Sequence, residues 1–94
     1  MSYEWHPLKA ATNLKDHGIA FEEAATVFDD PLAIITPDFA HSIEEQRFIC
    51  FGSSDQGRLL VVAFTERGDI IHIITAREMT PKERRFYAEG DSHT

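Results

Sequence analysis

Three short apolar segments between residues 47 and 76 constrain the fold more than any other feature of the chain. They span residues 47–52, 58–65 and 70–76 and are rich in the β-branched and aromatic residues typical of strands. The connections between them, residues 53–57 and 66–69, are too short for a crossover, so consecutive strands must pair antiparallel. A further strand over residues 32–36, closed by Pro37, completes a predicted four-stranded antiparallel meander.

Helical signals flank these strands on both sides. Pro7 suits a first helical turn and Gly18 a helix end, which predicts a helix over residues 7–17. Apolar residues at positions 21, 24, 25 and 28 have helical spacing and predict a second helix. The run Thr80-Pro81-Lys82-Glu83 matches a capping box and begins a third helix that reaches about Ala88. We therefore expect an α+β fold in which helices pack on the meander.

Length and composition favour one domain over residues 1–94, with residues 89–94 as a frayed polar tail. No apolar run approaches the roughly 20 residues of a membrane span, and the first residues do not resemble an export signal. Cys50 is the only cysteine, so no intrachain disulfide can form. These features lead us to expect a cytoplasmic protein.

The charges are unevenly distributed along the chain. The net charge is −7, yet residues 1–45 hold two lysines against nine carboxylates, whereas residues 46–94 hold seven cations, seven anions and all six arginines. Because guanidinium groups are fork-shaped partners of phosphate, we expect any phosphate-handling site in the second half. The acidic first half could face a basic partner, or the asymmetry could belong to an ordinary solvated surface.

Alternation of side chains along the last hairpin predicts a pair of arginines at one of its ends. Whether the 66–69 turn is a two-residue or a four-residue loop, Arg58 and Arg77 are predicted to lie on the core-facing side as cross-strand neighbours. Such a pair could neutralise a phosphate and the charge of its transition state. The alternative is that each arginine only edges the sheet and pairs with a carboxylate.

A second polar group is predicted near the other end of the hairpin, on the opposite face. It comprises Arg47, Thr65 and His72, beside Glu66 and Arg67 of the turn. A histidine in such a group could act as a general acid or base near neutral pH. Alternatively, His72 is a half-buried sheet residue whose polar atoms are satisfied by Thr65.

The sequence contains no pattern typical of a metal or cofactor site. Its five histidines and single cysteine include no His-x-x-x-His or Cys-x-x-Cys spacing, and there is no glycine-rich phosphate loop. Cys50 falls on the predicted core face, where it acts as a small hydrophobe. Tyr87 could stack on a base, or it could border the core. We expect neither a metal nor a cofactor.

Short segments spread over residues 3–88 share their order and spacing with a known family. They are Tyr3-Glu4-Trp5-His6-Pro7-Leu8-Lys9-Ala10, Asn13-Leu14-Lys15-Asp16-His17-Gly18-Ile19, Phe21-Glu22-Glu23-Ala24, Phe28-Asp29-Asp30-Pro31, His41-Ser42 with Glu45 and Arg47, Gly57-Arg58-Leu59-Leu60-Val61-Val62, Thr65-Glu66-Arg67, Ile73-Ile74-Thr75-Ala76-Arg77, and Glu83-Arg84-Arg85 with Tyr87. In these segments the chain resembles the BrnT toxins of bacterial type II toxin–antitoxin systems.

The resemblance implies a RelE-like fold and a ribonuclease that blocks translation by cutting RNA. It also implies a cognate BrnA-type antitoxin with a ribbon-helix-helix domain. Promoter DNA would be bound only through that antitoxin, and no membrane would be involved.

The resemblance also assigns roles to the polar groups described above. Cleavage would be metal-independent and would use the RNA's own 2′-hydroxyl as nucleophile. Arg67 and Arg77 would stabilise phosphate charge, His72 or Glu66 would transfer a proton, and Thr65 would position a group. Further contacts to RNA would come from Arg47, Arg58, Lys9 and Arg84.

Three positions depart from the family pattern. His6 replaces a usual Asp and Ala20 a usual Ser-type residue, and each change is expected to remove a helix N-cap at a cost of about 0.5–2 kcal/mol. His72 stands where many members carry Arg, which exchanges a fixed charge for a titratable one. With the acidic balance of the chain, this leaves an alternative function: a catalytically weak or inactive module that partners a DNA-binding antitoxin.

Overall fold

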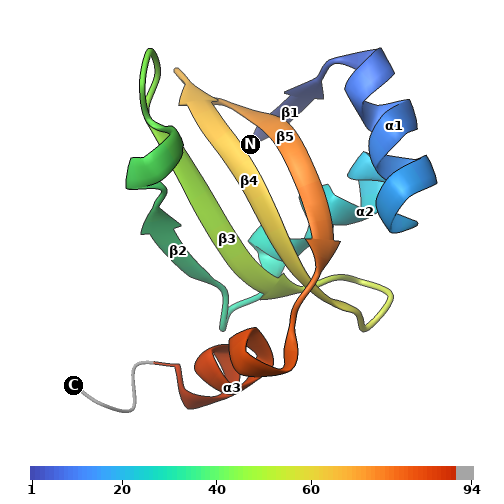
Figure 1. Ribbon diagram of the computed structural model, residues 1–94, viewed down its shortest axis with the longest axis vertical. Helices are drawn as coiled ribbons and strands as arrows, with labels where there is room; N and C mark the ends of the chain where they lie inside the picture. Colours follow the sequence, from blue (N-terminus) through green and yellow to red (C-terminus); the bar gives the residue numbers. More distant parts are fainter. Residues whose placement is uncertain (91–94) are drawn as a thin grey trace.

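Five strands form one mixed sheet in the computed structural model, which describes residues 1–90. The elements are β1 (Ser2–Trp5), α1 (Pro7–His17), α2 (Phe21–Ala25), the 3-10 turn η1 (Thr26–Asp29), β2 (Ile34–Pro37), the 3-10 turn η2 (Phe39–His41), β3 (Arg47–Ser53), β4 (Leu59–Arg67), β5 (Ile70–Glu78) and α3 (Pro81–Glu89). The strand order is β1-β5-β4-β3-β2 (Figure 1).

The predicted α+β class and the antiparallel meander β2–β5 are confirmed, and the prediction of only four strands is wrong. β1 lies at the edge of the sheet and pairs parallel with β5, with Glu4 opposite His72. Four residues give little periodicity, and a parallel partner 68 residues away leaves no turn signal in the sequence. The predicted tail also began too early, because Glu89 ends α3; its residues 91–94 lie outside the described part of the chain.

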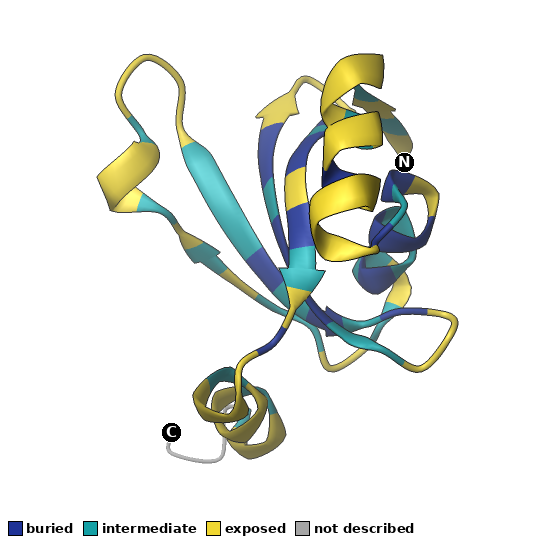
Figure 2. Cartoon of the chain, turned by 45° about the vertical axis from the view of Figure 1, so that its right-hand side comes forward, coloured by how far each residue is buried: buried dark blue, intermediate teal, exposed yellow. Residues whose placement is uncertain are grey.

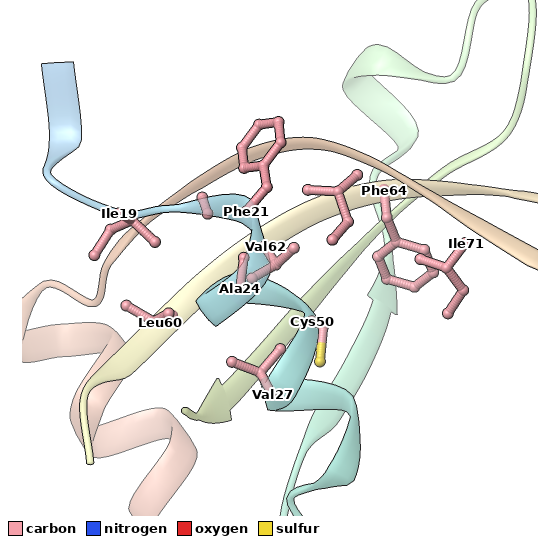
Figure 3. Packing of buried hydrophobic residues seen from close by; sticks show 11 residues of the cluster. Ile19, Phe21, Ala24, Val27, Cys50, Leu60, Val62, Phe64 and Ile71 are labelled. Atoms are coloured by element: carbon pink, nitrogen blue, oxygen red, sulfur yellow. The ribbon is translucent and has the colours of Figure 1, made fainter. Parts of the chain in front are cut away.

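One face of the sheet carries the core. Figure 3 shows Phe21, Ala24 and Val27 of α2 and η1 pointing toward the sheet side chains Cys50 and Val62. All five are fully buried. The register Cys50–Val62 and Phe48–Phe64 puts the even-numbered residues of β3 and β4 on this face, as alternation predicted. The outer surface of α1 and most of α3 remain exposed (Figure 2).

Gly52 sits where η1 crosses β3 and has no room for a side chain. A Cβ atom there would lie 3.0 Å from the Cβ of Val27 and 3.1 Å from its carbonyl oxygen. Glycine is therefore what allows the 3-10 turn to pack directly on the strand.

An irregularity in β5 changes the face that Arg77 occupies. Phe64 pairs with Ile73, but Ala63 pairs with Thr75, so Ile74 is an extra residue in β5. The bulge reverses the alternation beyond it and pairs Arg77 with Val61, on the face opposite the core. The prediction that Arg58 and Arg77 are cross-strand neighbours on one face is therefore wrong.

The side chain of Asn13 continues the edge of the sheet where β1 ends. Its Oδ1 accepts a hydrogen bond from the Ala76 amide at 3.0 Å, and its Nδ2 donates to the carbonyl oxygens of Ala76 and Ile19, both at 2.9 Å. Asn13 is 5% exposed. One amide side chain thus pairs with β5 as a strand would and fixes α1 against the sheet.

Two helix starts differ from the usual family pattern in different ways. The expectation that His6 leaves α1 uncapped is wrong, because His6 Nδ1 accepts a hydrogen bond from the Leu8 amide at 3.2 Å. Ala20 caps α2 with no side-chain hydrogen bond, as predicted. The predicted capping box of α3 is present between Thr80 and Glu83. None of the helices described is long and apolar enough to cross a membrane.

Replacing Asn13 with Ala should lower the free energy of unfolding by about 2–4 kcal/mol, because both backbone groups of Ala76 and the Ile19 carbonyl lose their partner in a buried site. The measurement is urea denaturation followed by circular dichroism. Thr12→Ala, a neighbour on the exposed side of α1, serves as the control. Equal losses for the two variants would contradict this role of Asn13.

Candidate active site

A row of polar side chains crosses four strands on the face opposite the core. The register places Glu4 of β1 opposite His72 of β5, His72 opposite Thr65 of β4, and Thr65 opposite Arg47 of β3. The predicted grouping of Arg47, Thr65 and His72 is confirmed. The row lies near the β4–β5 turn, at the opposite end of the sheet from α3 (Figure 1).

Arg67, at the end of β4, connects this row to the β2–β3 loop. Its Nε and Nη2 donate to the two carboxylate oxygens of Glu45, at 3.1 and 3.3 Å. Its Nη1 lies 3.5 Å from Glu4 Oε1 and 3.4 Å from His72 Nδ1. Glu4 Oε1 is also 3.2 Å from His72 Nδ1. One arginine, one histidine and two carboxylates therefore share a single contact network.

The ion pair between Arg67 and Glu45 stabilises the charged form of both residues. The hydrogen bond from Arg67 lowers the pKa of Glu45 against a smaller opposing effect of desolvation, and the charges of Arg67, His72 and Arg47 add to this shift. The same hydrogen bond raises the pKa of Arg67. Arg67 thus presents a permanently charged fork whose present partner is a carboxylate, which has the geometry of a phosphate edge.

Thr65 and Arg47 leave hydrogen-bonding capacity unused beside this network. Thr65 is 1% exposed, and its Oγ1 makes no hydrogen bond to any residue in the range 1–90. The half-buried Arg47 guanidinium likewise has no hydrogen-bond or ion-pair partner among the described residues. Arg47 also lines a surface hollow of about 340 Å³ together with His41, Ile43, Glu44 and Glu45. An incoming polyanion would meet Arg47 in this hollow, and Arg67 is bound to Glu45 at its border.

Arg58 serves the structure of the opposite end of the sheet. Its Nε donates to Glu23 Oε2 at 2.9 Å, its Nη2 contacts Glu23 Oε1, and Ser54 Oγ donates to Glu23 Oε2 at 2.7 Å. The hydrogen bond from Arg58 outweighs desolvation and lowers the pKa of the buried Glu23 carboxyl. This ion pair ties α2 to the β3–β4 turn.

Arg77 anchors α3. Its Nη1 and Nη2 donate to Glu83 Oε1 and Oε2 at 2.7 and 2.9 Å, while Glu83 Oε1 also accepts from the Thr80 amide. The Arg77 hydrogen bonds, with smaller help from Thr80 and against the effect of desolvation, lower the pKa of Glu83 to about 2. Arg77 pairs with Val61, four residues before Thr65, which is about 13 Å along β4.

The remaining predicted site residues lie away from the Arg67 network. Glu66 pairs with Ile71 and follows the core-side alternation of β4, so it faces away from Thr65 and Arg67. Arg84 is exposed on α3. Lys9 lines a separate hollow between α1 and β5. Tyr87 is half-buried and donates to Asp30 Oδ2 at 2.6 Å; burial first, and then this hydrogen bond, raise its pKa to about 12.

Sequence reasoning missed the two carboxylates of the network. Glu4 belongs to the strand that was not predicted, and its place beside His72 follows only from the parallel register. Glu45 lies in an irregular loop, where alternation gives no information. The one available signal was that both stand in segments shared with the family.

Replacing Glu83 with Gln tests the α3 anchor through its pH dependence. Because the folded-state pKa lies near 2 and the ordinary value is 4.5, the carboxylate should stabilise the fold above pH 4.5, and this contribution should decrease as the pH falls toward 2. At pH 7 the free energy of unfolding of the wild type should exceed that of Glu83→Gln by about 1–2 kcal/mol, a value kept low because Arg77 is partly exposed to solvent. The difference should shrink as the pH falls and vanish only below the folded-state pKa. Denaturant titrations at several pH values measure this difference. Glu22→Gln on the surface of α2 is the control, and a pH-independent difference for Glu83→Gln would exclude the ionic anchor.

Two comparisons with known proteins bear on the family and the fold of this chain. Residues 5–83 match the family model of the ribonuclease toxin BrnT of type II toxin–antitoxin systems. The structure is similar to the 1.1 Å crystal structure of the Brucella abortus ribonuclease toxin BrnT, with a TM-score of 0.67 and 20% sequence identity over 85% of this chain and 97% of that chain. At that identity the likeness shows a shared fold. No curated protein sequence matches. On the family match, which covers most of its length, the chain belongs to the BrnT family of ribonuclease toxins.

Proposed function

We propose that this chain is an endoribonuclease that needs no metal ion and cuts RNA through the 2′-hydroxyl adjacent to the scissile phosphate. The observation that carries the proposal is the contact network of Arg67, His72, Glu4 and Glu45. Beside it lies Arg47, whose guanidinium has no hydrogen-bond or ion-pair partner within residues 1–90. The network combines a phosphate-binding fork with a titratable group. The family match independently supports ribonuclease activity.

In the proposed reaction the 2′-oxygen attacks phosphorus and the bond from phosphorus to the 5′-oxygen breaks. The products are a 2′,3′-cyclic phosphate and a free 5′-hydroxyl. Arg67 and Arg47 offset the charge that builds on the non-bridging oxygens. His72 gives a proton to the departing 5′-oxygen, and Glu4 on its Nδ1 holds the ring in place.

RNA must displace Glu45 from Arg67 before this chemistry can begin. The exchange replaces one bidentate anion with another, so the guanidinium keeps a partner throughout. Glu45 therefore lowers the apparent affinity for RNA and raises selectivity for ligands that can supply a phosphate.

The sequence predicted that Arg77 stabilises the charge of the phosphate, and we propose a different role for it. Both Nη atoms of Arg77 are engaged by Glu83, and the residue lies about 13 Å along the sheet from Thr65. We assign Arg77 the positioning of α3. Arg58 has the corresponding structural role at α2, and Lys9 and Arg84 remain proposed peripheral RNA contacts.

The partner proposed for this chain is a BrnA-type antitoxin with a ribbon-helix-helix domain. The family belongs to type II toxin–antitoxin systems, in which a protein antitoxin neutralises the toxin. The nine carboxylates of residues 1–45 offer a surface for a basic partner segment. Through this partner the complex would bind its own promoter DNA. Unpaired toxin would inhibit translation in the cytoplasm.

Arg67→Ala tests the proposed function directly. The purified wild-type chain should cut RNA in the presence of EDTA and leave 2′,3′-cyclic phosphate ends, and a 2′-deoxy substitution at the cut site should block the reaction. Arg67→Ala should lower kcat/KM by about 100-fold, the effect of losing one charge-stabilising donor. Arg85→Ala, an exposed arginine on α3, should leave the rate unchanged.

Two results would refute the proposal. One is cleavage that stops in EDTA and returns with a divalent cation. The other is full activity of Arg67→Ala, both on RNA and in growth inhibition after induction without the antitoxin.

Thr65→Val separates function from folding at the centre of the site. Valine keeps the shape of threonine and removes a buried hydroxyl that has no partner among the described residues. The free energy of unfolding should stay constant or rise by about 1 kcal/mol. Cleavage should fall, because the hydroxyl is proposed to position a reacting group. Unfolding titrations and single-turnover cleavage measure the two effects, and a fully active variant would remove Thr65 from the site.

The second candidate function is an inactive module that partners a DNA-binding antitoxin. The observation in its favour is that Glu45 and Glu4 already occupy Arg67, while histidine replaces the usual arginine at position 72. A wild-type chain that binds its antitoxin but neither cuts RNA nor slows growth would establish this function instead.

A further inference from the structure

His41 is held in an ordered hydrogen-bond arrangement just outside the network described above. Its Nδ1 lies 2.9 and 3.1 Å from the two carboxylate oxygens of Asp38. The Asp38 side chain is 14% exposed and the His41 side chain 66% exposed. A carboxylate on Nδ1 favours the tautomer with the proton on that atom, which leaves the Nε2 lone pair free toward solvent.

The loop that carries this pair is fastened to the start of β3. The Asp38 amide donates to the Arg47 carbonyl at 2.8 Å. Ser42 Oγ donates to the Asp38 carbonyl at 2.7 Å and accepts from the Arg47 amide at 2.9 Å. Residues 38–42 therefore have a fixed position next to Arg47, one of the two arginines proposed to bind phosphate.

His41 also borders the hollow that contains that arginine. The same hollow is lined by Ile43, Glu44, Glu45 and Arg47, and Glu45 is the carboxylate that holds Arg67. The charged groups around the imidazole are thus Asp38, Glu44, Glu45 and Arg47. Arg47 and Arg67 belong to the neighbouring strands β3 and β4, while His41 belongs to the segment before β3 and His72 to β5 on the other side of β4.

Two exposed apolar side chains stand in the same loop. Phe39 is 81% exposed and Ile43 is 88% exposed. Exposed apolar side chains are unfavourable in water. The Phe39 ring is suited to stack on an unpaired base, and Ile43 offers an apolar contact in the same loop. They give the loop a means to hold the nucleotide that carries the attacking 2′-hydroxyl.

We infer that His41 is the general base of the proposed cleavage and Asp38 its positioning residue. His41 Nε2 takes the proton from the 2′-hydroxyl as the 2′-oxygen bonds to phosphorus. His72 gives a proton to the 5′-oxygen as the bond between that oxygen and phosphorus breaks. Protons balance over the reaction, since one histidine gains what the other loses. This inference rests on the proposed function and divides its proton transfers between two residues.

The test compares His41→Ala and His72→Ala on two RNA oligonucleotides, one natural and one with sulfur in place of the bridging 5′-oxygen at the cut site. A thiolate leaves without being protonated, so the sulfur substrate should restore His72→Ala to within a fewfold of wild type. His41→Ala should lose about 100-fold in kcat on both substrates. His17→Ala, an exposed histidine at the end of α1, is the matched control.

Two further readouts separate a chemical role from a structural one. Because His41 is exposed, added imidazole should partly restore His41→Ala. Asp38→Asn should lower kcat with little change in KM, and circular dichroism should show all variants folded. Wild-type activity in His41→Ala, or its rescue by the sulfur substrate, would overturn the assignment. In either case cleavage by wild type and its loss in Arg67→Ala would leave the proposed function standing.

Discussion

The single extra residue in β5 decides which face of the sheet Arg77 occupies, and with it how α3 is attached. Without the bulge at Ile74, Arg77 would lie on the core face with Arg58. With it, Arg77 faces the other side, where Glu83 binds it and α3 is held against that end of the sheet. The opposite end of the same face is left to Arg47, Thr65 and His72. The bulge therefore places the Arg77–Glu83 pair at one end of this face, while the proposed site lies at the other end.

The ion pairs at the two ends differ in the strength of their attachment. Glu83 bonds to Arg77 and to the Thr80 backbone, so the pair belongs to the helix cap as well as to the sheet. Glu45 comes from an irregular loop, and both it and Arg67 are about half exposed. Exposed pairs contribute little to stability and exchange readily. At the proposed site, Glu45 and Glu4 therefore hold Arg67 in place through contacts that a competing phosphate could replace.

Sequence alone predicted the elements that local patterns encode. The meander followed from apolar segments and short turns, the capping box from Thr80 and Glu83, and the Arg47–Thr65–His72 row from alternation. What escaped prediction depends on contacts between distant segments: β1 is too short to show a period, and the bulge has no residue signature in the run around Ile74. Because β1 was not predicted, Glu4 was missed. Because the bulge was not predicted, Arg77 was placed on the wrong face of the sheet.

Asn13 has a consequence for how the protein behaves in solution. A strand at the border of a sheet exposes unpaired backbone groups that can recruit other chains, and β5 would be such a border beyond the end of β1. The amide side chain occupies both groups of Ala76 at that point. At the other border β2 is only four residues long and ends in Pro37, which cannot donate to a neighbour. The sheet is thus protected on both sides against edge-to-edge aggregation, on one of them by a single side chain.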